Sequence, residues 1–197
     1  MEKRLSIPET TKLERVVTAL LGITVLDTAY LSWRYLSLHA GTVIPGTGLC
    51  SWTEGIDCDV VLQTPQARAL WVPNAVLGFG FYFGCFLWWT LGRRYFPQLK
   101  RHVLTTLTFW LAVAAIVTLW FFNLLMRLPA LCPFCPWNHV LSWVALFFVW
   151  KIRSQTPRDS RKAKTNSLIP LIAFCVGQLL MWLTLWFIAF NRGVFTP

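Results

Sequence analysis

Four of the six cysteines in this 197-residue chain form two pairs whose spacing suits thiol–disulfide chemistry. Seven residues separate Cys50 from Cys58, and Cys132 and Cys135 belong to a Cys-Pro-Phe-Cys sequence. Two residues between cysteines allow a small disulfide ring, and the unpaired N–H groups at a helix N-terminus stabilise a thiolate. The second pair therefore indicates a redox-active dithiol at the start of a helix.

Two other uses of the same cysteines remain open. All four together could form a tetra-cysteine zinc site, although seven residues is a wide spacing for zinc ligands. Two static disulfides are the other alternative, although closing a short Cys-x-x-Cys loop stabilises a protein little. Cys85 and Cys175 lie inside apolar stretches, where we expect them to be buried apolar side chains.

The composition indicates that these cysteines belong to an integral membrane protein. Hydrophobic residues make up 56% of the chain and charged residues 13%, about half of the charged share of a soluble domain. These values argue against a soluble enzyme, a disordered tail and a nucleic-acid-binding domain. Five apolar stretches reach or approach the roughly 20 residues that cross a bilayer. They are Leu13–Leu38, Trp71–Leu91, Val103–Met126, Leu131–Trp150 and Leu168–Phe190.

The basic residues predict the orientation of these spans. The N-terminus up to Arg15 and the segments between the second and third spans and between the fourth and fifth together hold 14 of the 18 Lys and Arg residues. The other four are Arg34, Arg68, Arg127 and Arg192. Because Lys and Arg accumulate on the cytoplasmic side, we expect a cytoplasmic N-terminus and an outer C-terminus. Both cysteine pairs then lie on the outer, oxidising side.

This topology divides the chain into four parts. Residues 1–12 form a cytoplasmic N-terminus, and residues 13–150 form a four-helix catalytic bundle with an outer cap loop at 39–70. Residues 151–167 form a basic cytoplasmic loop, and residues 168–197 form a fifth transmembrane helix with a short outer tail. One cysteine pair in the loop and one at the membrane surface predict a relay by thiol–disulfide exchange. The loop pair would meet a soluble protein, and the membrane pair a lipid-soluble oxidant, best fitted by a quinone.

Acidic residues stand out in two places. Asp27 interrupts the first span, so we expect it to face the bundle interior, either as a packing contact or as a proton relay. Glu54, Asp57 and Asp59 make the cap loop locally acidic. They would either steer a basic partner surface or simply be solvated.

At these residues the chain resembles the vitamin K epoxide reductase family in its bacterial form, over about residues 24–150. The resemblance rests on Asp27–Leu31, on Cys50, on Cys58–Pro65, on Val72–Gly78 and on Leu131–Cys135. The loop pair precedes the Cys-x-x-Cys sequence, and this order separates the family from the other quinone-coupled disulfide-forming family.

The resemblance implies an all-α integral membrane fold. Its core would be a four-helix transmembrane bundle around a quinone, with a fifth, peripheral transmembrane helix and an outer loop containing a short half-helix near residues 58–66. Cys135 would react with the quinone and Cys132 would be its exchange partner. Cys50 and Cys58 would be the shuttle pair, with Cys50 nearer the protein partner and Cys58 nearer Cys132.

The resemblance also implies contacts to the quinone. Asn74 matches the family's quinone-binding asparagine, and Thr64 matches a small hydroxyl near the cysteines. His139 stands where vertebrate relatives carry a tyrosine. It either binds a quinone oxygen or makes its hydrogen bonds to a neighbouring helix. Other candidates at similar depth or with rings that could pack nearby are Asn123, Asn138, Trp52, Phe134 and Trp137.

The predicted function is therefore a quinone-dependent thiol oxidoreductase that supports disulfide formation. It would sit in the inner membrane with its active site on the periplasmic side, use ubiquinone or menaquinone, and bind no metal and no nucleic acid. No thioredoxin domain follows the fifth span, so the donor would be a separate thioredoxin-fold protein. Two alternatives are a reductase of vitamin K quinones or epoxides and a non-catalytic membrane protein stabilised by a tetra-cysteine metal site.

Overall fold

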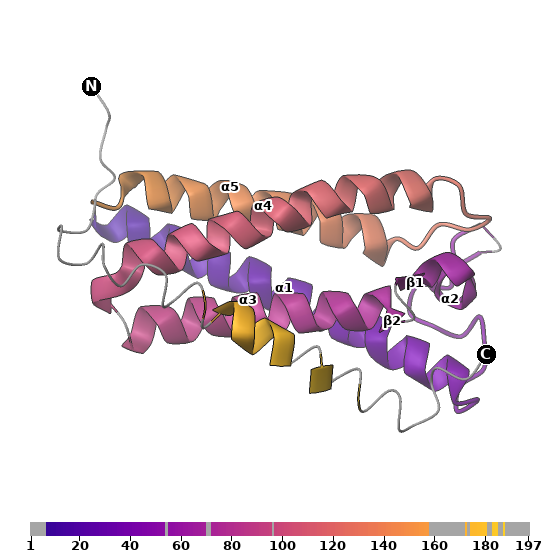
Figure 1. Ribbon diagram of the computed structural model, residues 1–197. Coiled ribbons are helices and arrows are strands. Elements are labelled where there is room, and N and C mark those ends of the chain that lie inside the picture. Colours follow the sequence, from indigo (N-terminus) through magenta and orange to yellow (C-terminus); the bar gives the residue numbers. More distant parts are fainter. Residues whose placement is uncertain are drawn as a thin grey trace.

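A computed structural model describes residues 7–53, 55–69, 72–95, 97–157, 172, 174–180, 183–184 and 187 (Figure 1). The elements run in the order α1 (Ile7–His39), α2 (Cys58–Gln63), the 3-10 turn η1 (Pro65–Ala67), β1 (Arg68–Ala69), β2 (Val72–Pro73), α3 (Asn74–Tyr95), the 3-10 turn η2 (Pro97–Leu99), α4 (Lys100–Leu125) and α5 (Phe134–Gln155).

The four long helices form one bundle. In Figure 1, α1, α3, α4 and α5 lie along a common direction, and α1 packs mainly against α3 and α5 while α4 packs mainly against α5. Among the residues that the structure describes, three segments are long and apolar enough to cross a membrane, namely Thr11–His39, Asn74–Tyr95 and Lys100–Leu125. Large apolar side chains such as Leu26, Ile116 and Leu119 are exposed on the bundle's outer surface, as expected for a lipid-facing surface. The predicted helical membrane bundle is confirmed.

Buried side chains close the bundle at the end opposite the cap. Leu104, Leu107, Leu111 and Val149 are fully buried there, together with Trp89. The indole Nε1 of Trp89 donates a hydrogen bond to Thr18 Oγ1 at 2.9 Å. Burial of large aliphatic and aromatic side chains fixes the helices against one another and so positions the opposite end.

The cap covers the other end of the bundle and contains the predicted half-helix. This half-helix is α2, which Asp57 caps by accepting a hydrogen bond from the Asp59 N–H. A narrow turn pairs Thr53 with Ile56, and Ile56 in turn pairs with Leu131 just before α5. The two-residue strands β1 and β2 pair antiparallel and lead the chain from the cap into α3. The backbone thus joins the cap to the start of α5.

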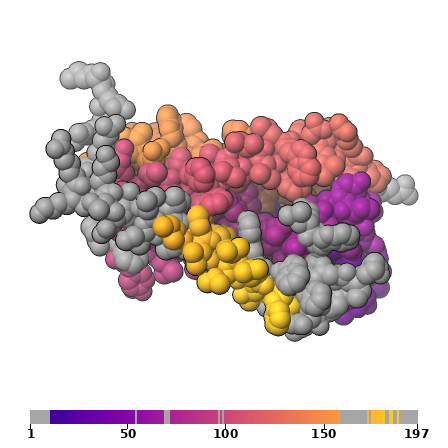
Figure 2. Space-filling model, viewed as in Figure 1, coloured from indigo at the N-terminus to yellow at the C-terminus, as the bar shows by residue number. Residues whose placement is uncertain are grey.

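The predicted fifth span, 168–190, lies largely outside the described residues, as do residues 1–6 and 158–171. Its described helical residues pack against α3, where Phe174 contacts Trp88 at a ring distance of 5.4 Å. Gln178 Nε2 donates to the Phe81 carbonyl at 3.4 Å. Gly84 permits this approach, because a Cβ atom at this position would overlap the Gln178 side chain. Figure 2 shows the segment in yellow on the outside of the bundle, the peripheral place predicted for it.

Candidate redox site

Three sulfur atoms meet beneath the cap. Cys50 and Cys58 form a disulfide, and the Sγ atom of Cys132 lies 2.9 Å from the Sγ atom of Cys58. The three Sγ atoms lie within 4.8 Å of one another, and all three side chains are completely buried. Thiol–disulfide exchange needs a thiolate to approach one sulfur of a disulfide. Cys58 and Cys132 meet this requirement with little further movement.

The fourth cysteine continues the path into the membrane. Helix α5 begins at Phe134, so Cys132 precedes the helix and Cys135 lies in its first turn, as the sequence predicts. The Cys135 N–H donates to the Cys132 carbonyl at 3.2 Å, and the side chains of the two cysteines also interact. Cys135 lines the wall of a cavity inside the bundle. The four cysteines therefore form a continuous path from the cap to this cavity.

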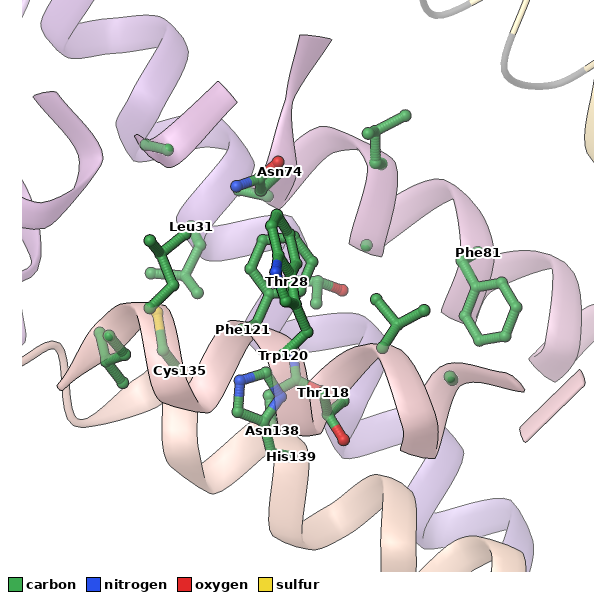
Figure 3. A pocket seen from close by; sticks show the side chains of 18 of the residues that line it. Thr28, Leu31, Asn74, Phe81, Thr118, Trp120, Phe121, Cys135, Asn138 and His139 are labelled. Carbon is green, nitrogen blue, oxygen red and sulfur yellow. The ribbon is translucent and has the colours of Figure 1, made fainter. Parts of the chain in front are cut away.

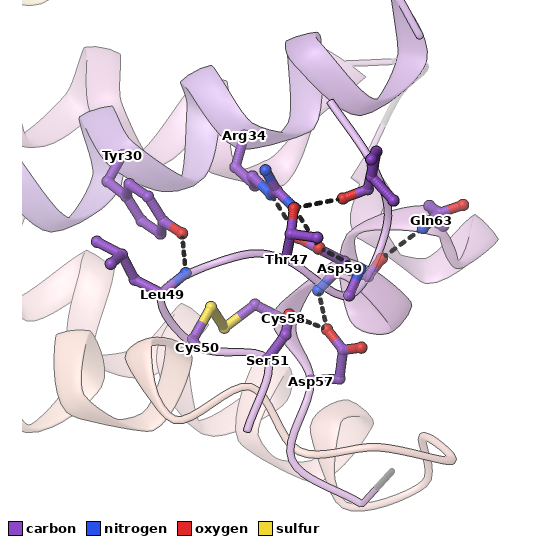
Figure 4. A network of polar contacts seen from close by, with 12 residues as sticks. Tyr30, Arg34, Thr47, Leu49, Cys50, Ser51, Asp57, Cys58, Asp59 and Gln63 are labelled. Atoms are coloured by element: carbon purple, nitrogen blue, oxygen red, sulfur yellow. Dashed lines mark hydrogen bonds and ion pairs between the residues drawn. A yellow bond between two sulfur atoms is a disulfide. The ribbon is translucent and has the colours of Figure 1, made fainter. Parts of the chain in front are cut away.

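A buried ion pair holds the cap on the bundle (Figure 4). Arg34, near the C-terminal end of α1, donates from Nε to Asp59 Oδ1 at 2.8 Å and from Nη2 to Asp59 Oδ2 at 2.7 Å. Its Nη2 group also donates to the Ile44 carbonyl at 2.9 Å and to Thr47 Oγ1 at 3.0 Å. Asp59 accepts a further hydrogen bond from the Gly46 N–H at 2.8 Å. Arg34 thus binds both α2 and the chain segment that leads to Cys50.

The ion pair changes the ionisation of Asp59. Burial raises the pKa of the Asp59 carboxyl, but hydrogen bonds from Arg34 and the Gly46 N–H, together with the charge of Arg34, outweigh it. The net pKa lies below the ordinary value of 3.8. The expectation of a solvated or partner-steering acidic cluster is wrong for Asp59, because its charge is buried and paired within the protein. Asp57 caps α2 and also accepts a hydrogen bond from Ser51, while Glu54 lies outside the described residues.

The chain just before Cys50 fits closely against α1. The hydroxyl oxygen of Tyr30 accepts a hydrogen bond from the Leu49 N–H at 2.7 Å. A Cβ atom on Gly48 would lie 3.2 Å from Arg34 Nε and from Asp59 Oδ1. A residue with a side chain at position 48 would therefore push against both partners of the ion pair.

A cavity of about 560 Å³ lies between the four long helices, and residues of α2 and η1 in the cap also line it (Figure 3). Its size falls in the range of small-molecule sites, and most of its wall is apolar, with aromatic residues such as Trp110, Trp120 and Phe121. Asn74 of α3 and His139 of α5 lie on opposite sides of it in Figure 3. Cys135 occupies the end of the wall next to the cap.

Some polar atoms at the cavity wall have no hydrogen-bond partner among the described residues. Asn74 Nδ2 donates to the Gln66 carbonyl at 2.8 Å, which leaves its second N–H and its Oδ1 atom available. Asn138 is 7% exposed, and its Oδ1 atom is also without a partner. Since buried polar groups are normally hydrogen-bonded, these atoms fit an apolar ring that carries a few oxygen atoms. A quinone has this chemistry.

Asp27 stands close to this part of the wall. Its carboxyl group interacts with the Asn138 side chain and acts electrostatically on Cys135 and Tyr82. The Tyr82 hydroxyl shares a hydrogen bond with Ser142 Oγ, which donates to the Asn138 carbonyl at 2.8 Å. Asp27 therefore contacts the polar side of the cavity, and its two predicted roles, packing contact and proton relay, both remain predictions.

The structure brings only some of the predicted ligand-binding residues to the cavity. Asn74 and His139 line it, whereas Thr64, Phe134 and Trp137 do not. Thr64 Oγ1 donates to the Val61 carbonyl at the end of α2, and Phe134 packs edge-on against Tyr30 at a ring distance of 5.6 Å. Trp137 is 54% exposed.

The helical repeat explains which of these residues face the cavity. On α5, Cys135, Asn138 and His139 have the i, i+3, i+4 spacing of one helix face, which turns Trp137 away. Of the two alternative asparagines, Asn138 lines the cavity and Asn123 is exposed on α4. Tyr82 was not predicted, although a tyrosine inside an apolar span is a signal that could have found it.

The fold and the site together define a class of protein: a multi-pass helical membrane protein with a thiol–disulfide site next to an apolar cavity. Compared with known families, the chain matches the vitamin K epoxide reductase family over residues 15–150. The match covers well over half of the chain, and the protein belongs to this family. Members are oxidoreductases that use quinones. No curated protein and no solved structure matches the chain.

Proposed function

We propose that the protein is a quinone-linked thiol oxidoreductase that takes electrons from a thioredoxin-fold protein and supports disulfide formation. The observation that carries the proposal is the sulfur path. The Sγ atoms of Cys58 and Cys132 lie 2.9 Å apart, and Cys135 follows at the cavity wall. Such a path connects a protein disulfide in the cap with a lipid-soluble oxidant in the bundle.

The internal step is an exchange between the two cysteine pairs. With the cap pair reduced and the membrane pair oxidised, the Cys58 thiolate attacks Cys132 Sγ, and the Cys132–Cys135 bond breaks to release the Cys135 thiolate. The Cys50 thiolate then attacks Cys58 Sγ and releases Cys132. The result is a Cys50–Cys58 disulfide beside free Cys132 and Cys135, which is the state of the structure.

The second step passes the electrons into the cavity. A quinone bound there would supply the oxidant, taking up two electrons and two protons to become the quinol. Cys135 supplies the reacting thiol, and its bond to Cys132 re-forms as the pair is oxidised. The free N–H of Asn74 is suited to an oxygen that gains negative charge, and His139 faces the same space from α5. Ubiquinone and menaquinone both fit this chemistry.

The donor is a separate thioredoxin-fold protein that reduces the cap pair. Both cap cysteines are completely buried, so its thiolate reaches Cys50 only when the cap opens, for example by movement of the turn that pairs Thr53 with Ile56 next to Leu131. Two backbone hydrogen bonds attach this turn, Asp57 N–H to the Leu131 carbonyl at 3.1 Å and Leu131 N–H to the Gly55 carbonyl at 2.9 Å. The partner's dithiol becomes a disulfide as Cys50 and Cys58 become thiols.

The orientation in the membrane follows from the charges. Arg93 and Arg94 end α3, Lys100 and Arg101 begin α4, and these ends lie together in Figure 1, opposite the cap. The positive-inside rule places this basic end in the cytoplasm. The cap and its cysteines then face the periplasm from the inner membrane, an oxidising side on which the reaction is useful.

The test is a quinone-reduction assay on protein purified from membranes. Extraction with organic solvent should recover a co-purifying quinone. A small dithiol should then reduce added ubiquinone or menaquinone only in the presence of the protein. Stoichiometric zinc without quinone reduction would contradict the proposal and favour a metal-stabilised protein. Reduction of a vitamin K epoxide without oxidation of a protein dithiol would favour a vitamin K-type reductase.

A further inference from the structure

We infer that Arg34 and Asp59 are positioning residues of the thiol relay, whose ion pair holds Cys58 in line with Cys132. The inference rests on the proposed function and extends it to residues that touch no reacting atom. It starts from the place of the ion pair, since Asp59 directly follows Cys58 and is hydrogen-bonded twice to an arginine of α1.

Helix α2 needs such an anchor because it is very short. It spans six residues, Cys58–Gln63, and helices of this length are not stable by themselves. Its position therefore depends on tertiary contacts. The Asp59 carboxylate, in the first turn of α2, is tied to the long helix α1, and any rotation of α2 would pull the two side chains apart.

The same arginine also fixes the chain on the other side of the disulfide. Arg34 Nη2 donates to Ile44 and Thr47, and Asp59 accepts from the Gly46 N–H. Figure 4 shows the guanidinium group of Arg34 and the carboxylate of Asp59 at the centre of these bonds, between α1 and the cap. The chain segment before Cys50 and the helix that begins at Cys58 are thus both held by this one ion pair.

The burial of the pair points to a geometric role. The side chains of Arg34 and Asp59 are 4% and 1% exposed. The loss of hydration of two buried charges largely cancels their attraction, so such a pair contributes little net stability, while its fixed two-pronged geometry sets position. Exchange between sulfurs is sensitive to position, since a misplacement of roughly 1 Å can slow an oriented reaction about a hundredfold.

The test variant replaces both charges, because removing only one leaves the other buried without a partner. The double variant Arg34→Met/Asp59→Leu keeps the approximate volume without the fixed geometry. Arg34→Lys is a second variant that retains the charge but not the two-pronged contact. Glu14→Gln is the matched control, because it removes the ion pairs of Glu14 with Arg93 and Lys100 at the opposite end of the bundle.

The first measurement follows the exchange without a quinone. In a Cys135→Ala background with the cap pair oxidised, the Cys132 thiolate attacks Cys58 Sγ, the Cys50–Cys58 bond breaks, and Cys50 leaves as a thiolate. An alkylating reagent captures the Cys50 thiolate, and mass spectrometry of peptides quantifies the Cys58–Cys132 bond. We expect the double variant to form this bond at least about tenfold more slowly, Arg34→Lys to be intermediate and Glu14→Gln to match the background. Equal rates in the double variant and the background would overturn the inference.

The second measurement separates positioning from general damage to the fold. With all cysteines present, the double variant should reduce quinone from a protein dithiol donor about tenfold more slowly. In a Cys50→Ala/Cys58→Ala background, where a small dithiol reduces the membrane pair directly, it should have no effect. An equal slowing in both backgrounds would overturn the inference. If the unmodified protein reduces no quinone, the proposed function fails, and the trapping rate alone decides the role of the ion pair.

Discussion

The cap and the cavity differ in whether their buried polar groups have hydrogen-bond partners within the protein. Where the cap meets α1, Arg34 and Asp59 are buried, and each makes several hydrogen bonds within the protein. At the cavity wall, Asn74 Oδ1 and Asn138 Oδ1 have no partner among the described residues. A site with its polar groups already paired is arranged before the reaction, and a site with spare polar atoms is suited to a ligand that supplies the partners.

This difference matches the chemistry proposed for each region. Exchange between Cys58 and Cys132 needs fixed sulfur atoms, and the cap supplies rigid support for one of them. The cavity must instead admit and release an apolar molecule. Substitutions at Cys135, which joins the two regions, in the cap, in the cavity and at the ion pair test this difference.

The largest effect should follow from cutting the link at Cys135. Cys135→Ala removes the thiol at the cavity wall, so the rate of quinone reduction should fall about a thousandfold or more, as on loss of a reacting nucleophile. The decrease in quinone absorbance with a small dithiol as donor measures it. Cys175→Ala is the control, because Cys175 is a free cysteine outside the four-cysteine path. Substantial activity in Cys135→Ala would show that electrons do not reach the cavity through Cys135.

A loss confined to the protein donor should follow from Cys50→Ala. Without Cys50 the cap cannot form its disulfide, so turnover with a reduced thioredoxin-fold partner should fall at least about a hundredfold. A small dithiol should still drive quinone reduction through Cys132 and Cys135. Full activity of Cys50→Ala with the protein partner would show that the cap is not the entry point for electrons.

In the cavity, loss of one hydrogen-bonding side chain should weaken quinone binding moderately. Asn74→Leu should raise the dissociation constant about tenfold, the equivalent of roughly one hydrogen bond. Quenching of tryptophan fluorescence on addition of quinone measures the affinity. Asn123→Leu, at an exposed position on α4, should leave it unchanged. Equal affinities in Asn74→Leu and the unmodified protein would mean that the spare polar atoms of Asn74 do not serve the ligand.

The smallest effect should be the pH dependence of the ion pair. Since the pKa of Asp59 is lowered on folding, its contribution to stability is complete above the ordinary value of 3.8 and is lost as the pH falls through the folded pKa. The Tm of the unmodified protein in detergent should therefore fall a few degrees more than that of Arg34→Met/Asp59→Leu when the pH is lowered through this range. The opposite order would indicate that the Asp59 carboxyl is protonated on folding.

The sequence predicts the parts of this molecule that depend on local patterns. Spans follow from apolar runs, and α5 begins at the Cys-Pro-Phe-Cys sequence because proline is tolerated in a first helical turn. The short helix α2 was expected only from the family resemblance, and its cap, Asp57, was not predicted. The two-residue strands β1 and β2 are too short to leave a pattern of alternating residues.

Contacts between distant segments could not be predicted in the same way. The Arg34–Asp59 pair joins residues 25 positions apart, and no pattern in the sequence links an arginine of the first span to an acidic residue of the cap loop. The face of α5 that meets the cavity depends on the rotation of the helix, which packing against α1 and α4 fixes. This is why Asn138 and not Trp137 lines the cavity.

The central claim is that both cysteine pairs deliver electrons to one quinone site, and counting quinols tests it most directly. The protein is fully reduced with a dithiol, freed of excess reagent and mixed with quinone. Each dithiol carries two electrons, so the unmodified chain should yield about two quinols and Cys50→Ala/Cys58→Ala about one. One quinol from the unmodified chain, with the cap pair still reduced, would contradict the relay.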